Sequence, residues 1–177
     1  MFKGSITALI TPFKDGEIDW KAFDNLVEWQ VEQGTHGVVP CGTTGESPTL
    51  SQDEKMSLLD AVINENNGAL QIVYGVGGND TISVGKLYKK IPAGVDGILS
   101  VSPYYNKPTQ MGIIAHFSYL ANCTNLPIIL YNVPGRTSSN MSAETVLELA
   151  RIPNVVAVKE ASGDLDQIME IIRLKED

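Results

Sequence analysis

Short apolar, β-branched runs alternate along this chain with segments whose apolar residues recur at helical spacing. The runs that predict strands are residues 6–10, 37–41, 71–75, 94–100, 127–131 and 154–159. The segments that predict helices are residues 19–33, 51–65, 80–91, 109–122, 142–151 and 164–175. N-cap residues support several helix starts, and Ser51 with Glu54 matches a capping box. Strict alternation of strand and helix predicts a parallel sheet covered by helices.

The last predicted strand delivers a single lysine at its end. Residues 155–158 are uniformly apolar, which predicts a strand buried on both faces, and Lys159 follows them directly. Desolvation at such a position favours the free amine that carbonyl chemistry requires. The alternatives are a lysine whose stem reaches solvent, or one that pairs with Glu160.

An open doubly wound sheet and a (β/α)₈ barrel both fit the alternation. The open sheet predicts a glycine-rich phosphate loop after the first strand, but residues 10–13 read Ile-Thr-Pro-Phe, and the glycine-rich residues 75–79 do not fit GxGxxG. Polar residues follow the strand ends instead, and these ends converge on one face of a barrel, where catalysis occurs. The residues concerned are Thr43, Thr44, Asn79, Tyr104, Tyr105, Tyr131, Arg136 and Lys159. We therefore expect an α/β protein of the (β/α)₈ barrel class.

The number of βα units is smaller than a closed barrel needs. A closed barrel has eight strands, whereas the pattern predicts about six βα units, with no linker that would divide two domains. We expect residues 1–177 to be the N-terminal part of a single barrel domain whose C-terminal units are missing. We also expect this chain, on its own, to be inactive in turnover.

Composition and charge exclude several classes of binding partner and cofactor. The formal net charge of −8 argues against nucleic acid and anionic membranes as partners. Cys41 and Cys123 form no metal-binding or redox spacing, and His36 and His116 are too few for a zinc site or a histidine-based triad. The N-terminus lacks the pattern of a signal peptide, and no apolar run approaches the roughly 18 residues of a membrane span. We expect a cytoplasmic protein without a metal or organic cofactor.

Three loops carry candidate chemistry, each with a purely structural alternative. The turn GTTGES at 42–47 offers backbone N–H groups and hydroxyls to a small carboxylate, although such residues are also ordinary in turns. The loop SPYYNKP at 102–108 holds two tyrosines that could transfer protons or pack on a neighbour. The segment YNVPGRT at 131–137 holds an arginine suited to clamping a carboxylate, or one that is simply solvated.

The strings GTTGES, SPYYNKP, YNVPGRT and VVAVKEASGD, in this order and spacing, resemble the dihydrodipicolinate synthase family. This family belongs to the pyruvate-dependent class I aldolases, which include N-acetylneuraminate lyase. The resemblance implies a (β/α)₈ barrel, homotetrameric in most members. It also implies condensation of pyruvate with L-aspartate 4-semialdehyde through a lysine Schiff base, giving 4-hydroxy-tetrahydrodipicolinate for lysine and diaminopimelate biosynthesis. The alternatives are a sister pyruvate aldolase or dehydratase, such as an N-acetylneuraminate lyase-like enzyme, and an inactive fragment.

The same resemblance implies roles for individual residues. Lys159 resembles the lysine that forms the Schiff base with pyruvate, and Tyr131 resembles the general acid/base beside it. Thr44 and Tyr105 resemble the other members of a hydroxyl relay, with Tyr105 contributed by a neighbouring subunit. Thr43 resembles the residue that binds the pyruvate carboxylate.

Two further sites follow from the resemblance. Arg136 resembles the residue that holds the carboxylate of aspartate semialdehyde, which favours this substrate over sialic acid. A possible regulatory cleft, where lysine inhibits some members, corresponds to Ser47, Pro48, Gly77, Asn79 and Tyr104. Lysine-sensitive relatives carry His, His and Glu where this chain has Gln52, Lys55 and Ser83, so we expect weak or absent feedback by lysine.

Overall fold

The computed structural model describes residues 2–175, which gather into two compact units. The first unit comprises the residues up to Gly75 together with 92–97, and the second comprises 76–91 and the residues from Ile98 onwards. The boundary after Gly75 falls in the glycine-rich residues 75–79. The prediction that residues 1–177 form part of one barrel domain stays a prediction.

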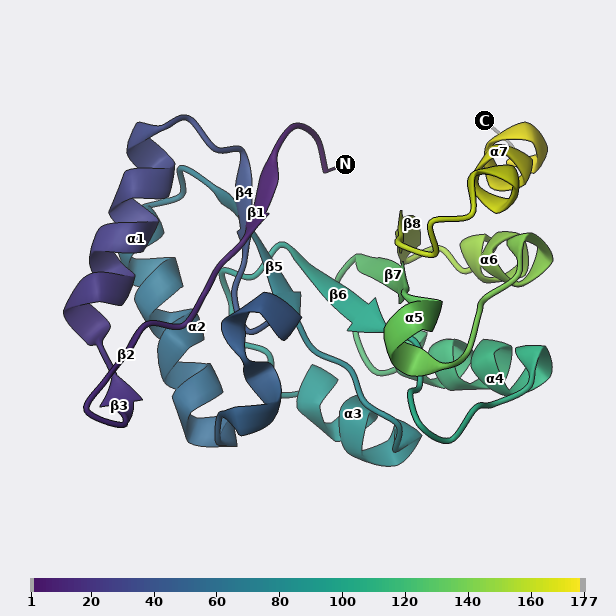
Figure 1. Ribbon diagram of the computed structural model, residues 1–177, viewed down its shortest axis with the longest axis horizontal. Helices are drawn as coiled ribbons and strands as arrows, with labels where there is room; N and C mark the ends of the chain where they lie inside the picture. The colour runs from purple at the N-terminus through teal and green to yellow at the C-terminus, as the bar shows by residue number, and fades with distance from the viewer. Residues whose placement is uncertain (1, 176–177) are drawn as a thin grey trace. The chain divides into compact units, whose positions relative to one another are not determined.

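The first unit contains three parallel strands in the order β1-β4-β5. These are β1 (Ile6–Ala8), β4 (Gly37–Val39) and β5 (Gln71–Gly75). Helices α1 (Trp20–Glu32) and α2 (Gln52–Asn66) pack against each other beside the strands (Figure 1). Two short 3₁₀ helices, η1 (Thr43–Gly45) and η2 (Ser47–Thr49), connect β4 to α2.

A small antiparallel hairpin in the first unit was missed by the sequence prediction. Strands β2 (Phe13–Lys14) and β3 (Glu17–Ile18) pair across a turn in which Asp15 and Gly16 have φ of 53° and 87°. Asp-Gly is a preferred sequence for a two-residue hairpin turn because both central residues must adopt positive φ. The signal was therefore present in residues 13–18, between the first predicted strand and helix.

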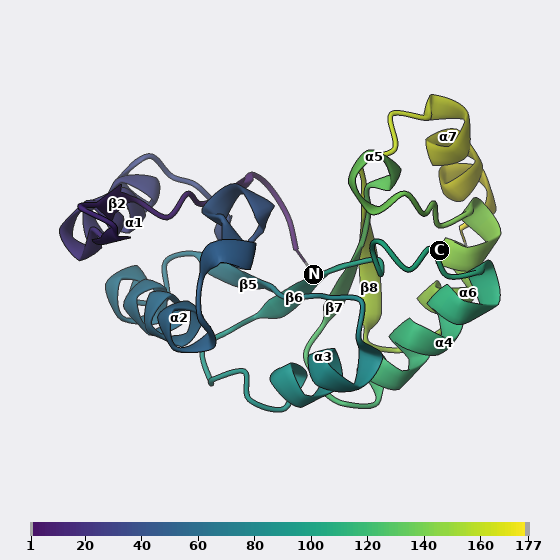
Figure 2. The same cartoon turned by 60° about the horizontal axis from the view of Figure 1, so that its bottom comes forward.

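The second unit contains strands β6 (Gly97–Val101), β7 (Ile128–Asn132) and β8 (Val155–Glu160), parallel and in that order. Its helices are α3 (Thr81–Tyr88), α4 (Gln110–Ala121), α5 (Pro134–Thr137), α6 (Ala143–Ala150) and α7 (Leu165–Leu174). Consecutive long helices are in contact, and α4, α6 and α7 follow one another along one side of β7 and β8 (Figure 2). The predicted alternation of strands and helices is confirmed.

The predicted start of β6 at residue 94 is wrong. Gly94 lies in a turn with φ of 98°, a conformation that a strand does not use, and β6 begins at Gly97. A Cβ atom added at Gly94 would lie 3.0 Å from a side-chain carbon of Ile63 on α2. The apolar composition of the segment was read as strand, whereas Val95 is buried within the turn.

The prediction that β8 is buried on both faces is also wrong. Only Val155 is buried, whereas Val156, Ala157 and Lys159 are exposed. The physical reason is that β8 pairs with β7 alone within residues 2–175, so it is an edge strand of the described part of the sheet.

The capping box predicted at the start of α2 is present. The backbone N–H of Glu54 donates to Ser51 Oγ at 3.2 Å, and the Ser51 N–H donates to Glu54 Oε2 at 2.7 Å. We expect Ser51→Ala to lower the free energy of unfolding by about 1 kcal/mol, because a helix N–H loses its acceptor. Ser57→Ala, in the exposed middle of the same helix, should instead be neutral or slightly stabilising. Urea unfolding followed by circular dichroism measures both changes; equal effects would contradict the capping assignment.

The core of the second unit holds a buried histidine on α4. His116 is 4% exposed, its Nδ1 lies 2.7 Å from Thr81 Oγ1, and its Nε2 has no hydrogen-bond partner among the described residues. The His116 ring contacts the Phe117 ring edge-on, with the two ring centroids 5.0 Å apart. Burial lowers the pKa of His116 from 6.5 to about 4, because the charged ring loses its hydration.

Because His116 is buried in its neutral form, we expect the protein to lose stability in mild acid. The folded-state pKa lies below the unfolded value, so protonation favours the unfolded chain. Above pH 6.5, His116 is neutral in both states and does not reduce the free energy of unfolding. As the pH drops towards 4, its protonation in the unfolded chain lowers that free energy by up to about 3 kcal/mol. We expect His116→Gln to destabilise the protein more at pH 7.5 than at pH 4.5 in urea unfolding. A difference that stays constant between these pH values would show that His116 is not buried in neutral form.

Candidate functional site

A β-bulge sets the register between β7 and β8. Ile128 pairs with Val155, but Ile129 pairs with Ala157, so Val156 is an extra residue on β8. An unbroken ladder would place Val158 opposite Tyr131, whereas the bulge places Lys159 there. Because side chains alternate between the two faces of a strand, this shift decides which side chain shares a face with Tyr131.

Lys159 and Tyr131 form the centre of the candidate site. Lys159 Nζ lies 4.5 Å from the centroid of the Tyr131 ring, within the range of a cation–π contact, which is worth roughly 0.5–1 kcal/mol at an exposed position. Lys159 is exposed and Tyr131 is half-buried. The contact holds an amine beside a phenol at the carboxyl ends of two parallel strands.

Lys159 is not neutralised by the residue that follows it. Within residues 2–175 the ion pairs are Arg151 with Glu148 and Arg173 with Glu170, and Lys159 takes part in neither. Glu160 points to the other face of β8 because consecutive side chains alternate. Of the alternatives for Lys159, pairing with Glu160 is therefore wrong, whereas a lysine that reaches solvent agrees with its exposed side chain. The expected desolvation of Lys159 is wrong, because the face of β8 that carries it is uncovered among residues 2–175.

The Glu160 carboxylate is instead bound by neutral donors. It accepts hydrogen bonds from the Asn132 and Gln167 side chains and from the backbone N–H of Ser162. Asn132 is fully buried and precedes the short helix α5. Sequence reasoning missed Asn132 and Gln167, because only the position of Asn132 next to Tyr131 indicated a role.

Arg136 and the tyrosine pair also lie in the second unit. Arg136 is exposed on α5, five residues after Tyr131, and Pro134 at the first helical position fixes the start of this single turn. Tyr104 is 42% exposed and Tyr105 is 86% exposed, so Tyr104 is partly covered and Tyr105 is largely free of contacts in the described part of the chain. Tyr105 has φ of 69°, a conformation that is uncommon for residues other than glycine.

Two asparagines hold the loop that contains Tyr104 and Tyr105 through hydrogen bonds. Asn79 Nδ2 donates to Tyr104 O at 3.2 Å, and Asn106 Nδ2 donates to Asn79 O at 2.9 Å. The structure thus brings together two of the predicted regulatory-cleft residues, Asn79 and Tyr104. Gly77 packs against β6, since an added Cβ would lie 2.8 Å from a Val101 methyl. Ser83 is engaged in the α3 cap, where its hydroxyl donates to Asp80 at 2.6 Å.

The hydroxyl-rich turn lies in the first unit. Thr43 and Thr44 are exposed in η1, directly after β4, and Thr11 Oγ1 anchors this turn by donating to Gly45 O at 2.8 Å. A Cβ atom at Gly75 would lie 2.8 Å from the backbone of Gly42, so only glycine fits there. The turn also continues into η2, which holds Ser47 and Pro48. The predicted meeting of Thr43 and Thr44 with Lys159 stays a prediction.

No group of three or more His, Cys, Asp or Glu side chains within residues 2–175 is arranged to hold a metal ion. Across that range, no helix combines the length and apolar character required to traverse a membrane. Burial raises the pKa of the Cys41 thiol to about 12, so this cysteine is a poor nucleophile.

A model of the Dihydrodipicolinate synthetase family matches residues 1–177. The chain belongs to this family. It is 49% identical over 175 residues to the 4-hydroxy-tetrahydrodipicolinate synthase of Thermodesulfovibrio yellowstonii, covering 98% of this chain and 60% of that protein. It is 53% identical over 169 residues to the enzyme of the same name from Sphingopyxis alaskensis, covering 95% and 58%. The chain therefore spans about 60% of the length of these relatives.

Solved structures of family members share the fold. Dihydrodipicolinate synthase from Aquifex aeolicus superposes with a TM-score of 0.95 at 43% identity, covering 99% of this chain and 61% of that one. The 4-hydroxy-tetrahydrodipicolinate synthase from Methylacidiphilum fumariolicum SolV gives a TM-score of 0.96 at 41% identity, covering 99% and 59%. The predicted fold class is confirmed, with this chain supplying six βα units of a (β/α)₈ barrel.

Proposed function

We propose that this chain carries the pyruvate-binding lysine of a 4-hydroxy-tetrahydrodipicolinate synthase, which condenses pyruvate with L-aspartate 4-semialdehyde. One observation carries the proposal. In a member of this family, the amine of Lys159 lies 4.5 Å from the Tyr131 ring centroid, at the carboxyl ends of parallel strands. Catalytic groups of (β/α)₈ enzymes lie at this end of the strands.

The proposed chemistry needs an amine and groups that transfer protons. The amine of Lys159 attacks the ketone of pyruvate, and loss of water gives an iminium. Loss of a methyl proton then gives an enamine, whose carbon attacks the aldehyde of the second substrate. The substrate's own amine closes the ring by displacing Lys159 from the imine. We assign proton transfer in these steps to Tyr131, whose ring lies beside the Lys159 amine, and, from the resemblance to the family, to Thr44 and Tyr105.

The experiment that tests the proposal is reductive trapping. The 177-residue chain is incubated with pyruvate and sodium cyanoborohydride, digested and analysed by mass spectrometry. The proposal predicts a 1-carboxyethyl group on Lys159, formed far faster than on other lysines. No preferential modification of Lys159 would favour the reading as an inactive fragment.

A sister pyruvate aldolase or dehydratase would give the same trapped product, so the second substrate needs a test of its own. Arg136 is exposed on α5 and forms no ion pair within residues 2–175, which leaves its guanidinium free for a substrate carboxylate. We expect Arg136→Ala to leave pyruvate trapping unchanged. The semialdehyde concentration that consumes the enamine should rise roughly tenfold, from loss of a charge-assisted hydrogen bond. Arg151→Ala, which removes a surface arginine of α6, is the control.

A shift of similar size in both arginine variants would contradict this role for Arg136. Consumption of the enamine by pyruvate-aldolase substrates, but not by the semialdehyde, would favour the sister enzyme. Assembly as a homotetramer and a cytoplasmic location are part of the same proposal, supported by the family alone.

A further inference from the structure

The carboxylate of Glu160 accepts hydrogen bonds from three uncharged donors, and the Asn132 side-chain amide is shared between its two oxygens. Asn132 Nδ2 lies 3.1 Å from Oε1 and 2.9 Å from Oε2. The Ser162 N–H donates to Oε1 at 2.8 Å, and Gln167 Nε2 donates to Oε2 at 3.0 Å. Hydrogen bonds to a charged acceptor are stronger than neutral ones. Glu160 is therefore firmly held, and its carboxylate is engaged away from Lys159.

The donors are themselves fixed by further bonds. Asn132 Oδ1 accepts the Met141 N–H at 3.0 Å, and Asn132 Nδ2 also lies 2.8 Å from Asn140 Oδ1. Asn140 Nδ2 donates to Gln167 Oε1 at 2.7 Å. We call Asn132, Asn140, Glu160 and Gln167 the Glu160 cluster. It joins the end of β7, the loop before α6, the end of β8 and the first turn of α7.

The cluster lies one residue beyond the candidate site in the strand ladder. Tyr131 pairs with Lys159, and Asn132 pairs with Glu160. By alternation, the cluster occupies the opposite face of the two strands from the amine and the phenol. It fastens β7 to β8 without touching Lys159, and the Ala161 N–H, donating to Asn132 O at 2.8 Å, extends the pairing past the cluster.

The hydrogen bonds of the Glu160 cluster matter because few other contacts fix the position of β8 along β7. It has one neighbouring strand within residues 2–175, it contains a bulge, and α7 behind it leaves Leu165 and Met169 about 70% exposed. Burial on the face of β8 that carries Lys159 does not fix the register, because Ala157 and Lys159 on this face are exposed. A slip of one residue would replace Lys159 by a neighbour on the face shared with Tyr131.

We infer that Glu160 is a positioning residue, whose hydrogen bonds to Asn132 and Gln167 hold β7 and β8 in the register that places Lys159 over Tyr131. The inference rests on the proposed function, since the group being positioned is the imine-forming amine. A carboxylate suits this position because both oxygens accept hydrogen bonds. A glutamine would turn its own N–H₂ group towards Asn132 Nδ2 or Gln167 Nε2, leaving donors facing each other.

The test compares Glu160→Gln with Glu170→Gln in the pyruvate trapping assay. Glu170 lies on α7 and pairs with Arg173 at the surface, so its variant removes a charge without touching the cluster. We expect Glu160→Gln to slow trapping at Lys159 roughly tenfold, since a displacement of about 1 Å can cost up to 10²-fold in rate. Loss of a nearby negative charge alone would favour the neutral amine and speed trapping. Slower trapping in Glu160→Gln would therefore indicate lost positioning of Lys159, and faster trapping would indicate the effect of charge alone.

A second variant tests the pairing itself. Adding Asn132→Asp to Glu160→Gln places a carboxylate opposite an amide again, with the two groups exchanged between the strands. We expect this double variant to recover most of the trapping rate, which a general loss of stability would not do. If Glu160→Gln fails to fold, Gln167→Met removes one of the three donors to Glu160 and should slow trapping by a smaller factor, about threefold.

A spectroscopic readout keeps the inference separate from the proposed function. Lysines are methylated reductively with ¹³C-formaldehyde, and the Lys159 signal, assigned with Lys159→Arg, should be shifted by the Tyr131 ring current. Glu160→Gln should lose that shift and the double variant should regain it. An unchanged shift and trapping rate in Glu160→Gln would overturn the inference while leaving the function intact. If pyruvate fails to label Lys159 in the unmodified chain, the function is overturned and the methyl shift alone decides the inference.

Discussion

Replacing Lys159 with arginine is expected to reduce pyruvate-dependent trapping to the background of the surface lysines, the largest change in activity that we predict. Arginine keeps the positive charge and can still lie over the Tyr131 ring, but its guanidinium stays protonated and does not form an imine with a ketone. Loss of trapping would therefore report loss of the nucleophile rather than loss of the local electrostatics. The measurement is the mass of the peptide that contains position 159 after reduction.

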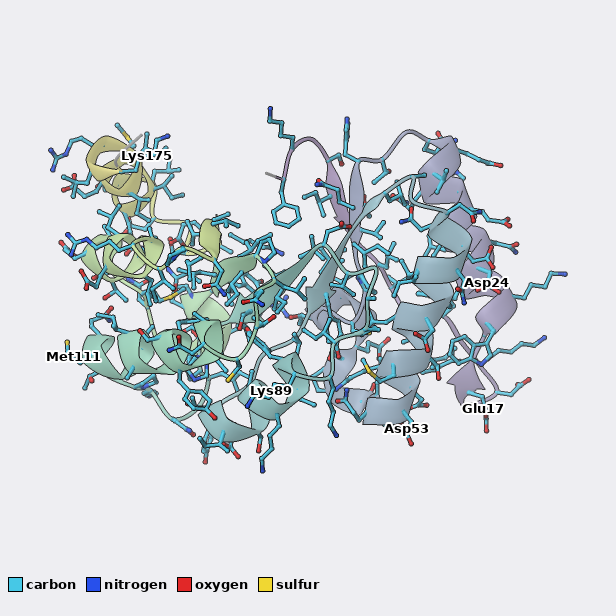
Figure 3. The ribbon with its side chains drawn as sticks, turned by 180° about the vertical axis from the view of Figure 1, so that it is seen from behind. Glu17, Asp24, Asp53, Lys89, Met111 and Lys175 are labelled. Carbon is cyan, nitrogen blue, oxygen red and sulfur yellow. The ribbon has the colours of Figure 1, made fainter. Side chains whose placement is uncertain are left out.

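Lys89→Arg is the matched control for this experiment. Lys89 is an exposed lysine at the end of α3 (Figure 3). Its replacement should leave the trapped peptide and its yield unchanged. Residual pyruvate-dependent trapping in Lys159→Arg at the original rate would mean that another lysine carries the chemistry, and the proposed function would need a different centre.

Replacing Phe117 with alanine is expected to lower the free energy of unfolding by about 3–5 kcal/mol, the largest change in stability that we predict. Phe117 on α4 is fully buried, and its removal leaves a cavity beside His116 in addition to the lost apolar contacts. Domains are stable by about 5–15 kcal/mol in total, so this variant should lose a large part of its margin. Urea unfolding followed by circular dichroism measures the change.

Met111 on the same helix provides the control for Phe117. Its side chain is 73% exposed and lies at the outer end of α4 in Figure 3. Met111→Ala should change the free energy of unfolding by no more than about 0.5 kcal/mol, as is usual for surface positions. Equal losses for Phe117→Ala and Met111→Ala would mean that α4 does not bury the face that contains Phe117.

Helix positions could be predicted from the sequence because the signals that set them are local. Asp19, Ser51, Asp80 and Ser142 each accept a backbone N–H from the first turn of the helix that follows, as their residue types predict. The hairpin at residues 13–18 was also a local signal, and it was overlooked because its strands are only two residues long. Local chemistry was therefore sufficient for most element boundaries.

The burial of β8 and the partners of Glu160 could not be predicted in this way. The apolar composition of residues 155–158 predicted a strand covered on both faces, but coverage depends on which other segments lie against it. Glu160 binds Asn132 and Gln167, and the contact with Asn132 spans 28 residues of sequence. No local sequence pattern indicates these hydrogen bonds of Glu160, because a glutamate next to a lysine is equally typical of a surface ion pair.

The sequence by itself determined the order of the βα units, the starts of the helices, the lysine at the end of the sixth predicted strand and the motifs that place the chain in its family. Only the tertiary structure decided that Lys159 faces Tyr131 and that Glu160 faces away from it. Both outcomes depend on one extra residue in β8, at Val156, which shifts the pairing of the strands by one position. Strand register results from pairing between distant segments, and a shift of a single residue exchanges the two faces of a strand.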